Sequence, residues 1–462
     1  ISAIDIDSLS ADMTALKESL NDVFLCLMSI VILSMQVGFA LLEAGSVPAK
    51  NVTSILLRNV LDSFVGATMY YLFGYALSFG QPDNRFCGAG YWALSGLPTN
   101  RYSHFLFNAM FAATAASIVS GAVADRSTFS AYTMYTALIS GFVYPIVSHW
   151  VWSPRGWLAA TNVTIVGVDA PVQLRFMDFA GSGVVHLLGG SASFVAAVIL
   201  RPRIGRFPAN SPTSEPTSTA ATTSGVIPGH SVPLVATGGF VLFCGFLAFN
   251  GGSHASVSSV GDGRVLALAM LNTLLSGSAS GLTVLAVSKI RTGRWSLLST
   301  VNAGLSGMVS ICASCNSVEP WAALATGVVA GVAYLACSNL VVRLRVDDPV
   351  EAVSVHFSGG LVGLLLVALF HSKRGILANP GLLSALNFAW QLVGLIVIIA
   401  WSTGFSLAVF GCLQLAGWYR VSELDEGVGL DKAEHGEAAY PYERLRETGE
   451  LLAAKFDDCN EF

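Results

Sequence analysis

Long apolar stretches, separated by short polar segments, follow one another along most of the chain. Eleven of them are long enough to cross about 30 Å of hydrocarbon as helices of about 20 residues. The pattern predicts an all-α membrane protein of eleven transmembrane helices, and an odd number of crossings places the two chain ends on opposite sides of the membrane. The predicted helices are centred near Ile30, Gly66, Ala112, Ser140, Leu188, Gly245, Ser276, Leu305, Ala330, Leu364 and Ile399.

The composition agrees with a chain that crosses a membrane many times. Of the 462 residues, 53% are hydrophobic and only 11% are charged, which is not the balance of a soluble domain. The formal net charge of -5 comes largely from the acidic segment after Arg420, and the chain has no basic block. Nucleic-acid binding is therefore set aside, and membrane lipids are the expected surroundings.

Basic residues predict the orientation of the chain. They concentrate in the segments that follow odd-numbered helices, so the positive-inside rule places the N-terminus outside and the C-terminus in the cytosol. We divide the chain into a transmembrane domain over 1–418, interrupted by a Pro/Ser/Thr-rich cytosolic linker over 207–232, and a cytosolic C-terminal tail over 419–462. The basic residues concerned are Arg201, Arg203, Arg206, Lys289, Arg291, Arg294, Arg343 and Arg345.

One histidine motif occurs twice. Asp178 stands eight residues before His186, Asp348 stands eight residues before His356, and in each copy small residues stand three, four and seven positions after the histidine, on its own helix face. The copies fall on the fifth and tenth helices, so the chain is predicted to contain two inverted five-helix repeats and a final helix.

The repetition decides between two interpretations of this motif. A single copy is well explained by a capping Asp, a buried His and Gly for helix packing. Ionisable residues within membrane spans are costly, however, and usually face the bundle interior or a water-filled path. We therefore expect His186 and His356 to face each other near the midplane, at the interface of the two repeats.

Aromatic residues lie on three other predicted helices. Phe107 and Phe111 stand one turn apart on the third helix, Phe249 and Ser253 do so on the sixth, and Trp152 follows the fourth. Such residues usually belong to a core or to an interfacial belt. Beside paired histidines they could instead form a cage for a small cation, because a ring face attracts positive charge by about 0.5 to 2 kcal/mol.

The remaining candidates indicate structure rather than chemistry. Cys312 and Cys315 have CxxC spacing without a second pair, and the two histidines lack a third ligand at suitable spacing on their helices. We predict no metal and no cofactor. Arg58 and Asp62, four residues apart on the second helix, are expected to form a partly buried ion pair.

Several longer motifs stand in a characteristic order: 38–51 (GFALLEAGSVPAKN), 144–152 (YPIVSHWVW), 178–186 (DFAGSGVVH), 318–323 (VEPWAA) and 345–348 (RVDD). Together they resemble the ammonium transporter (Amt/Mep/Rh) family, and the nearest branch is that of plant-type transporters. The resemblance runs over about 38–440, nearly the whole chain.

The resemblance implies a homotrimer of eleven-helix protomers, in the plasma membrane, that carries ammonium or ammonia and is not an enzyme. Each protomer would have its own pore. By position, the resemblance implies an outer ammonium site of Trp152, Phe107 and Ser253 supported by Asp178, a gate of Phe111 and Phe249, and a pore lined by His186 and His356.

The C-terminal segment resembles the part of the family through which subunits are coupled. Gly429, Asp431 and Gly436 carry this likeness and are the expected regulatory residues. Ala433 departs from the plant pattern, in which a phosphorylatable Thr often stands. Closure by phosphorylation at that position is therefore not expected here.

Physical chemistry favours one mechanism for such a pore. A bare ammonium ion in a narrow apolar pore loses several kcal/mol of solvation that an aromatic cage offsets only in part. We expect ammonium to be deprotonated near the gate, ammonia to pass the histidines, and a proton to follow. An ammonium sensor or transceptor, an electroneutral Rh-like ammonia channel and an intramembrane enzyme are the alternatives.

Overall fold

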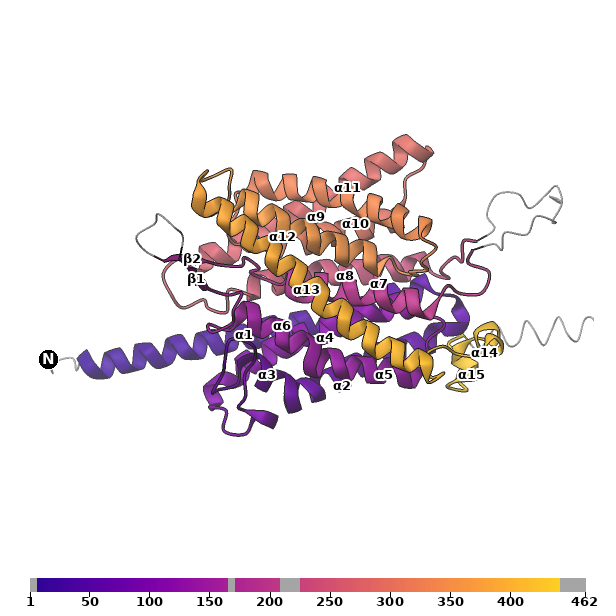
Figure 1. Ribbon diagram of the computed structural model, residues 1–462, viewed down its shortest axis with the longest axis horizontal. Helices are drawn as coiled ribbons and strands as arrows, with labels where there is room; N and C mark the ends of the chain where they lie inside the picture. Colours follow the sequence, from indigo (N-terminus) through magenta and orange to yellow (C-terminus); the bar gives the residue numbers. More distant parts are fainter. Residues whose placement is uncertain (1–5, 165–170, 208–224, 441–462) are drawn as a thin grey trace, which may run out of the picture.

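The computed structural model describes residues 6–164, 171–207 and 225–440. Long helices lie side by side in an elongated bundle, with α1 beginning at one end and the short helices α14 and α15 lying at the other (Figure 1). Over these residues, eight helical segments are long and apolar enough to span a membrane. They are Asp7–Ser46, Thr99–Val123, Ser182–Leu200, Val232–Gly252, Asp262–Thr292, Pro320–Arg343, Val353–Phe370 and Leu382–Leu415.

Every one of the predicted helix centres falls within a helix. The α-helices within these eight segments are α1 (Ile6–Ser46), α4 (Tyr102–Val123), α7 (Leu188–Leu200), α8 (Val232–Gly252), α9 (Asp262–Thr292), α11 (Pro320–Arg343), α12 (Ser358–Phe370) and α13 (Leu382–Leu415). The other α-helices are α2 (Val52–Met69), α3 (Tyr75–Phe79), α5 (Phe129–Leu138), α6 (Tyr144–Trp152), α10 (Leu297–Ile311), α14 (Glu423–Val428) and α15 (Leu430–Ala433). The all-α membrane fold is confirmed.

Three of the predicted crossings are less regular than the pattern suggests. Helices α2 and α3 are joined by the π-turn η2 (Tyr70–Gly74), and α5 and α6 by the π-turn η5 (Ile139–Val143). Helix α10 has 15 residues, which corresponds to about 22 Å at 1.5 Å per residue. That all eleven segments cross the membrane remains a prediction.

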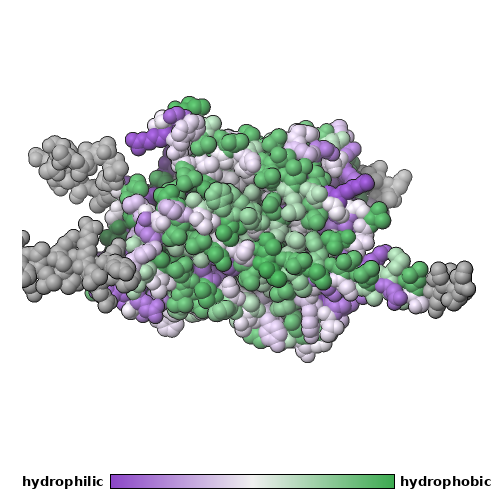
Figure 2. Space-filling model, turned by 180° about the vertical axis from the view of Figure 1, so that it is seen from behind, coloured by the Kyte–Doolittle hydropathy of each residue, from purple (hydrophilic) through white to green (hydrophobic). Residues whose placement is uncertain are grey.

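Apolar side chains cover the outside of the bundle. Figure 2 shows a broad hydrophobic region over the middle of the molecule, with the most hydrophilic residues gathered toward its two ends. This is the arrangement that lipid tails around the middle and water at both ends require. Exposed members include Phe240 of α8, Leu282 of α9, Val332 of α11 and Ile396 of α13.

The two histidine helices have matching structures. Each begins with a π-turn, η6 (Ser182–Leu187) before α7 and η7 (Val353–Phe357) before α12, and η6 packs against α12 as η7 packs against α7. A Cβ on Gly190 would lie 2.3 Å from the backbone N of Phe357, and one on Gly360 would lie 2.5 Å from the backbone O of Ser182. Small residues therefore let the two repeats cross at backbone contact.

The connections add little regular structure. Three short 3₁₀ helices, η1 (Ala49–Asn51), η3 (Trp92–Leu94) and η4 (Thr99–Arg101), precede or interrupt loops. Strands β1 (Thr161–Val163) and β2 (Val172–Leu174) pair antiparallel at the end of the bundle opposite α14 (Figure 1). Of the predicted linker, 208–224 lies outside the described residues, as does 441–462 of the tail.

The expected ion pair between Arg58 and Asp62 is wrong. Both side chains are fully buried, but Arg58 donates to Ser127 and lies 3.6 Å from Glu434 of the tail. Asp62 accepts hydrogen bonds from neighbouring side chains instead, including the hydroxyl of Tyr132. Each side chain therefore bonds to a segment packed against α2 rather than to its neighbour along α2, and burial makes such partners necessary for both groups.

Candidate functional site

The residues predicted for the outer site lie around one pocket. This outer pocket has a volume of about 230 Å³ and is lined by Phe107, Trp152 and Ser253. A separate cavity of about 460 Å³ lies at the tail end of the bundle. The indole Nε1 of Trp152 donates to the backbone O of Asp178 at 2.8 Å, which holds the ring at the rim. His104 and Asn108 also line this pocket, although their sequence positions did not single them out.

Below the pocket the aromatic rings form a continuous column. The ring centroids of Phe111 and Phe249 are 3.9 Å apart with an interplanar angle of 24°, and both side chains are buried. Phe111 contacts Trp152 above at 5.7 Å, and Phe249 contacts His186 below at 5.6 Å. The rings thus close the way from the outer pocket to the histidines.

The two histidines face each other as the repeated motif predicts. Nδ1 of His186 lies 3.1 Å from Nδ1 of His356, and the rings are nearly parallel, 11° apart. One of these two nitrogens must carry the proton of the hydrogen bond. The other ring nitrogen of His186, Nε2, is buried without a protein partner.

A carboxylate caps the start of each histidine helix. Asp178 accepts backbone hydrogen bonds from Gly181, Gly183 and Val184 at 3.0, 2.8 and 2.9 Å. Its repeat mate Asp348 caps the tenth predicted helix with two such bonds, from Ala352 at 3.0 Å and Val353 at 2.8 Å. The cap satisfies N–H groups that a buried helix start would otherwise leave without partners.

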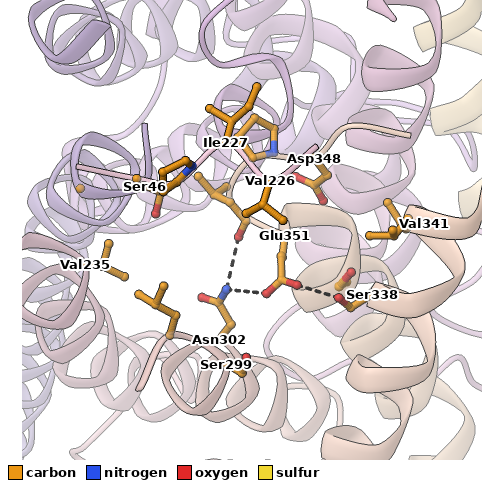
Figure 3. A pocket seen from close by; sticks show the side chains of 18 of the residues that line it. Ser46, Val226, Ile227, Val235, Ser299, Asn302, Ser338, Val341, Asp348 and Glu351 are labelled. Atoms are coloured by element: carbon orange, nitrogen blue, oxygen red, sulfur yellow. Dashed lines mark hydrogen bonds between the residues drawn. The ribbon is translucent and has the colours of Figure 1, made fainter. Parts of the chain in front are cut away.

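Two carboxylates that the sequence analysis did not select lie beyond the histidines. Glu43 and His356 both line a small cavity of about 20 Å³. Glu351 faces the larger cavity of about 460 Å³, where its carboxylate accepts from Asn302 at 2.9 Å and Ser338 at 2.6 Å (Figure 3). Glu43 is an acidic residue within an apolar run, and that signal could have identified it.

Ion pairs at this end of the bundle hold the loops together. Arg203 binds Asp347 through two hydrogen bonds of 2.8 and 2.9 Å and also contacts Asp125 at 2.8 Å. Burial opposes ionisation of Asp347, but the hydrogen bonds of Arg203 and the charges of Arg126 and Arg203 outweigh it and lower the pKa to about 2. For the adjacent Asp348, burial raises the pKa to about 7. The pKa values of these two neighbouring carboxylates therefore shift in opposite directions, and that of Asp347 is lowered by its bonds to Arg203.

The tail docks against the start of α2. The carboxylate of Asp431 accepts from the backbone N of Thr53 at 3.0 Å and of Ser54 at 2.8 Å. Gly429 has φ +104°, and a Cβ there would lie 2.6 Å from the Cβ of Lys50. Gly436 has φ +68° with open space around it, so it supplies a turn rather than a contact.

Comparison with known proteins identifies the family. The model of the Ammonium Transporter Family matches residues 23–440. The chain belongs to this family. Because the family consists of membrane transporters, the ammonium transporter is an integral membrane protein and not an enzyme.

Individual relatives agree with this membership. The chain is 45% identical to "Putative ammonium transporter 1" of Caenorhabditis elegans, over 95% of this chain and 82% of the relative. It is 35% identical to "Ammonium transporter 1 member 3" of Solanum lycopersicum, over 92% and 94% of the two chains. The resemblance to the ammonium transporters, including plant-type members, is confirmed.

Solved structures share the fold. A structure described as "Sensor Amt Protein" is 32% identical, with a TM-score of 0.80 over 91% of this chain and 100% of the other. Mep2 of Candida albicans, at 23% identity, has a TM-score of 0.75 over 88% and 87% of the two chains, and this likeness concerns the fold alone.

Proposed function

We propose that this ammonium transporter captures ammonium in the outer pocket, deprotonates it at the aromatic gate, and conducts ammonia past the twin histidines while a proton follows. The observation that carries the proposal is the unbroken series from the outer pocket through Phe111 and Phe249 to His186 and His356. Family membership supports ammonium as the substrate.

Capture rests on the rings of Trp152 and Phe107 and on the hydroxyl of Ser253. Ring faces attract a cation by about 0.5 to 2 kcal/mol, and a hydroxyl oxygen accepts one of its hydrogen bonds. The buried carboxylate of Asp178 lies behind Trp152, to which its backbone oxygen is hydrogen-bonded. These groups favour positive charge above the gate.

Passage beyond the gate favours the neutral molecule. Moving a bare cation between stacked rings costs several kcal/mol of solvation, whereas ammonia loses far less. The unpartnered Nε2 of His186 offers ammonia a hydrogen bond at the first position below Phe249. Potassium has no proton to release, so the same barrier rejects it.

We also propose an orientation, an oligomeric state and a membrane for the protein. Basic residues after odd-numbered helices support an external N-terminus and a cytosolic C-terminus. A homotrimer in the plasma membrane, with a transmembrane domain over 1–418 and a cytosolic regulatory tail over 419–462, rests on the family resemblance. Regulation through Gly429, Asp431 and Gly436 is part of this proposal.

One experiment tests the main proposal. The chain is expressed in cells without ammonium transporters of their own, and labelled methylammonium uptake is measured together with membrane current. We expect saturable uptake accompanied by inward current that potassium does not evoke. Uptake without current would indicate an electroneutral ammonia channel. If the protein reaches the cell surface and gives neither uptake nor current, transport is contradicted.

A sensory function is the second candidate, because the chain resembles a structure described as "Sensor Amt Protein". The same expression experiment separates the two. A sensor that transports little would give negligible uptake in a well-assembled protein, whereas a transporter gives uptake without any partner protein.

Trp152→Leu is expected to weaken capture. Loss of the indole removes about 1 to 2 kcal/mol of attraction for the cation, so half-saturation should move to roughly tenfold higher ammonium while flux at saturation changes less. Concentration dependence of uptake checks this. Trp157→Leu is the matched control, because Trp157 packs on Trp150 and Trp390 outside the pocket. Equal half-saturation in both variants would mean that Trp152 does not contribute to cation capture.

Gly429→Asp is expected to act on neighbouring subunits. The residue would be strained at φ +104° and would collide with Lys50, so the tail would leave its docking position. Co-expression with wild type should depress uptake more than dilution of active subunits explains. Gly427→Asp, where a Cβ meets nothing within 4 Å, is the control. A strictly proportional loss with Gly429→Asp would mean that the pores work independently.

A further inference from the structure

A cavity lies directly on the far side of the histidine pair from the gate. It measures about 20 Å³ and is lined by Glu43, Ser117, Asn302 and His356 among apolar residues. A water molecule needs roughly 10 to 15 Å³ of such space and two to four polar partners. This cavity therefore has the room and the polar groups to hold one water between an imidazole and a carboxylate.

Glu43 reaches this cavity from α1. Phe39, one helical turn earlier, packs its ring 6.5 Å from that of His356, so the same face of α1 that contacts the histidine also carries Glu43. The carboxylate is 2% exposed and accepts hydrogen bonds from Asn59 at 2.8 Å and from the hydroxyl of Ser120. These bonds fix Glu43 in place as one of the residues that line the cavity.

The histidine pair has open nitrogens at both ends. Nε2 of His186 is buried and unpartnered on the gate side. Nδ1 of each ring bonds to the other, and within the described part of the chain Nε2 of His356 has no protein partner. A proton accepted at one Nε2 can therefore leave from the other, after one proton shifts across the bond between the Nδ1 atoms.

We propose that Glu43 is the proton acceptor on the cytosolic side of the histidine pair. The inference rests on the proposed function, in which a proton follows ammonia. The proton released by ammonium at the gate enters at His186, and the proton on Nε2 of His356 passes through one water to Glu43, which becomes a neutral carboxylic acid. Ammonia then takes that proton, so ammonium forms and the carboxylate of Glu43 is regenerated.

The way out continues past Asn302. This residue lines both the small cavity and the larger one of about 460 Å³, and Val350 does the same. Figure 3 shows Asn302 joined to Glu351 by a hydrogen bond within the larger cavity, so a second carboxylate lies beyond the small cavity. Ammonium formed at Glu43 thus leaves toward negative charge.

The other charged groups near Glu43 do not replace it. Arg58 and Asp62 of α2 are the charged residues that act on it electrostatically, and neither lines the cavity. A carboxylate with only a structural role here could be exchanged for glutamine, whose amide can bond to both Asn59 and Ser120. Proton acceptance is the property that glutamine lacks.

The test is Glu43→Gln in cells that lack ammonium transporters, with current and labelled methylammonium uptake recorded on the same cells. We expect the charge moved per substrate ion taken up to fall roughly tenfold. A positioned proton acceptor speeds proton transfer by about 10²- to 10⁴-fold, so without it most ammonia should pass before a proton follows. Ser120→Ala is the matched control, because it removes a hydrogen bond to Glu43 but keeps the carboxylate. Its charge ratio should equal that of the wild type.

The outcomes separate this inference from the proposed function. A wild type that takes up substrate without current contradicts the charged mode itself. A wild type with current and a Glu43→Gln variant with the same charge ratio overturn only the role of Glu43. If Glu43→Gln does not reach the membrane, Glu43→Asp decides: a lower maximal rate with an unchanged ratio supports the relay, and a maximal rate equal to that of the wild type contradicts it.

Discussion

Asp178→Ala is expected to abolish ammonium uptake. Three backbone N–H groups at the start of the helix that carries His186 would lose their acceptor. Loss of a cap costs about 0.5 to 2 kcal/mol, and each buried N–H left unpaired costs about 1 to 3 kcal/mol. The helix start would shift, and with it the backbone oxygen that holds Trp152. Negative charge above the gate would be lost as well.

The measurement is initial uptake at low ammonium, normalised to protein at the cell surface. We expect a decrease of more than about tenfold, since a loss of 1.36 kcal/mol at the rate-limiting barrier already corresponds to tenfold. Asp348→Ala is the matched control, because Asp348 caps the other histidine helix, through two backbone hydrogen bonds. It lines the larger cavity beyond the histidines, so capture should suffer less. Normal uptake by an assembled Asp178→Ala protein would contradict both roles of Asp178.

Carboxylates in place of the histidines are expected to relax selectivity. In His186→Asp or His356→Glu, a fixed negative charge would replace a neutral ring in the middle of the protein, where both histidines are buried. Such a charge stabilises a cation that has not lost a proton, because it compensates part of the lost solvation. Potassium would then be able to compete. Ammonium-evoked and potassium-evoked currents, recorded against voltage, check the prediction.

The expected result is a potassium current in the variants that the wild type lacks. His149→Gln is the control, because His149 is fully buried and contacts backbone oxygens of Ser78 and Asn84 away from the described cavities. It should retain the selectivity of the wild type. If His186→Asp and His356→Glu both exclude potassium as well as the wild type does, discrimination does not depend on the histidine pair.

The sequence by itself determined the class of the protein and much of its internal symmetry. Hydrocarbon requires long apolar helices whose backbone groups bond internally, so the runs of apolar residues predicted helices at every one of their centres. The spacing from Asp178 to His186 recurs from Asp348 to His356, and helix geometry converts equal spacing into equal placement on a helix. The facing histidines followed from the repeat.

The tertiary structure decided which distant groups meet. Arg58 bonds to Ser127 and lies near the tail, although helix spacing favoured a pair with Asp62. Asp431 reached the start of α2, a contact that no local pattern indicates.

Glu43 illustrates the physical reason for this difference. Its apolar neighbours in the sequence predict only that α1 buries it, whereas its place beside His356 depends on how α1 packs against the second repeat. Hydrophobic pattern is a property of one segment, and it selects the element and its buried face. The partner of a buried polar group is selected by the packing of whole helices, which brings together residues far apart in the chain.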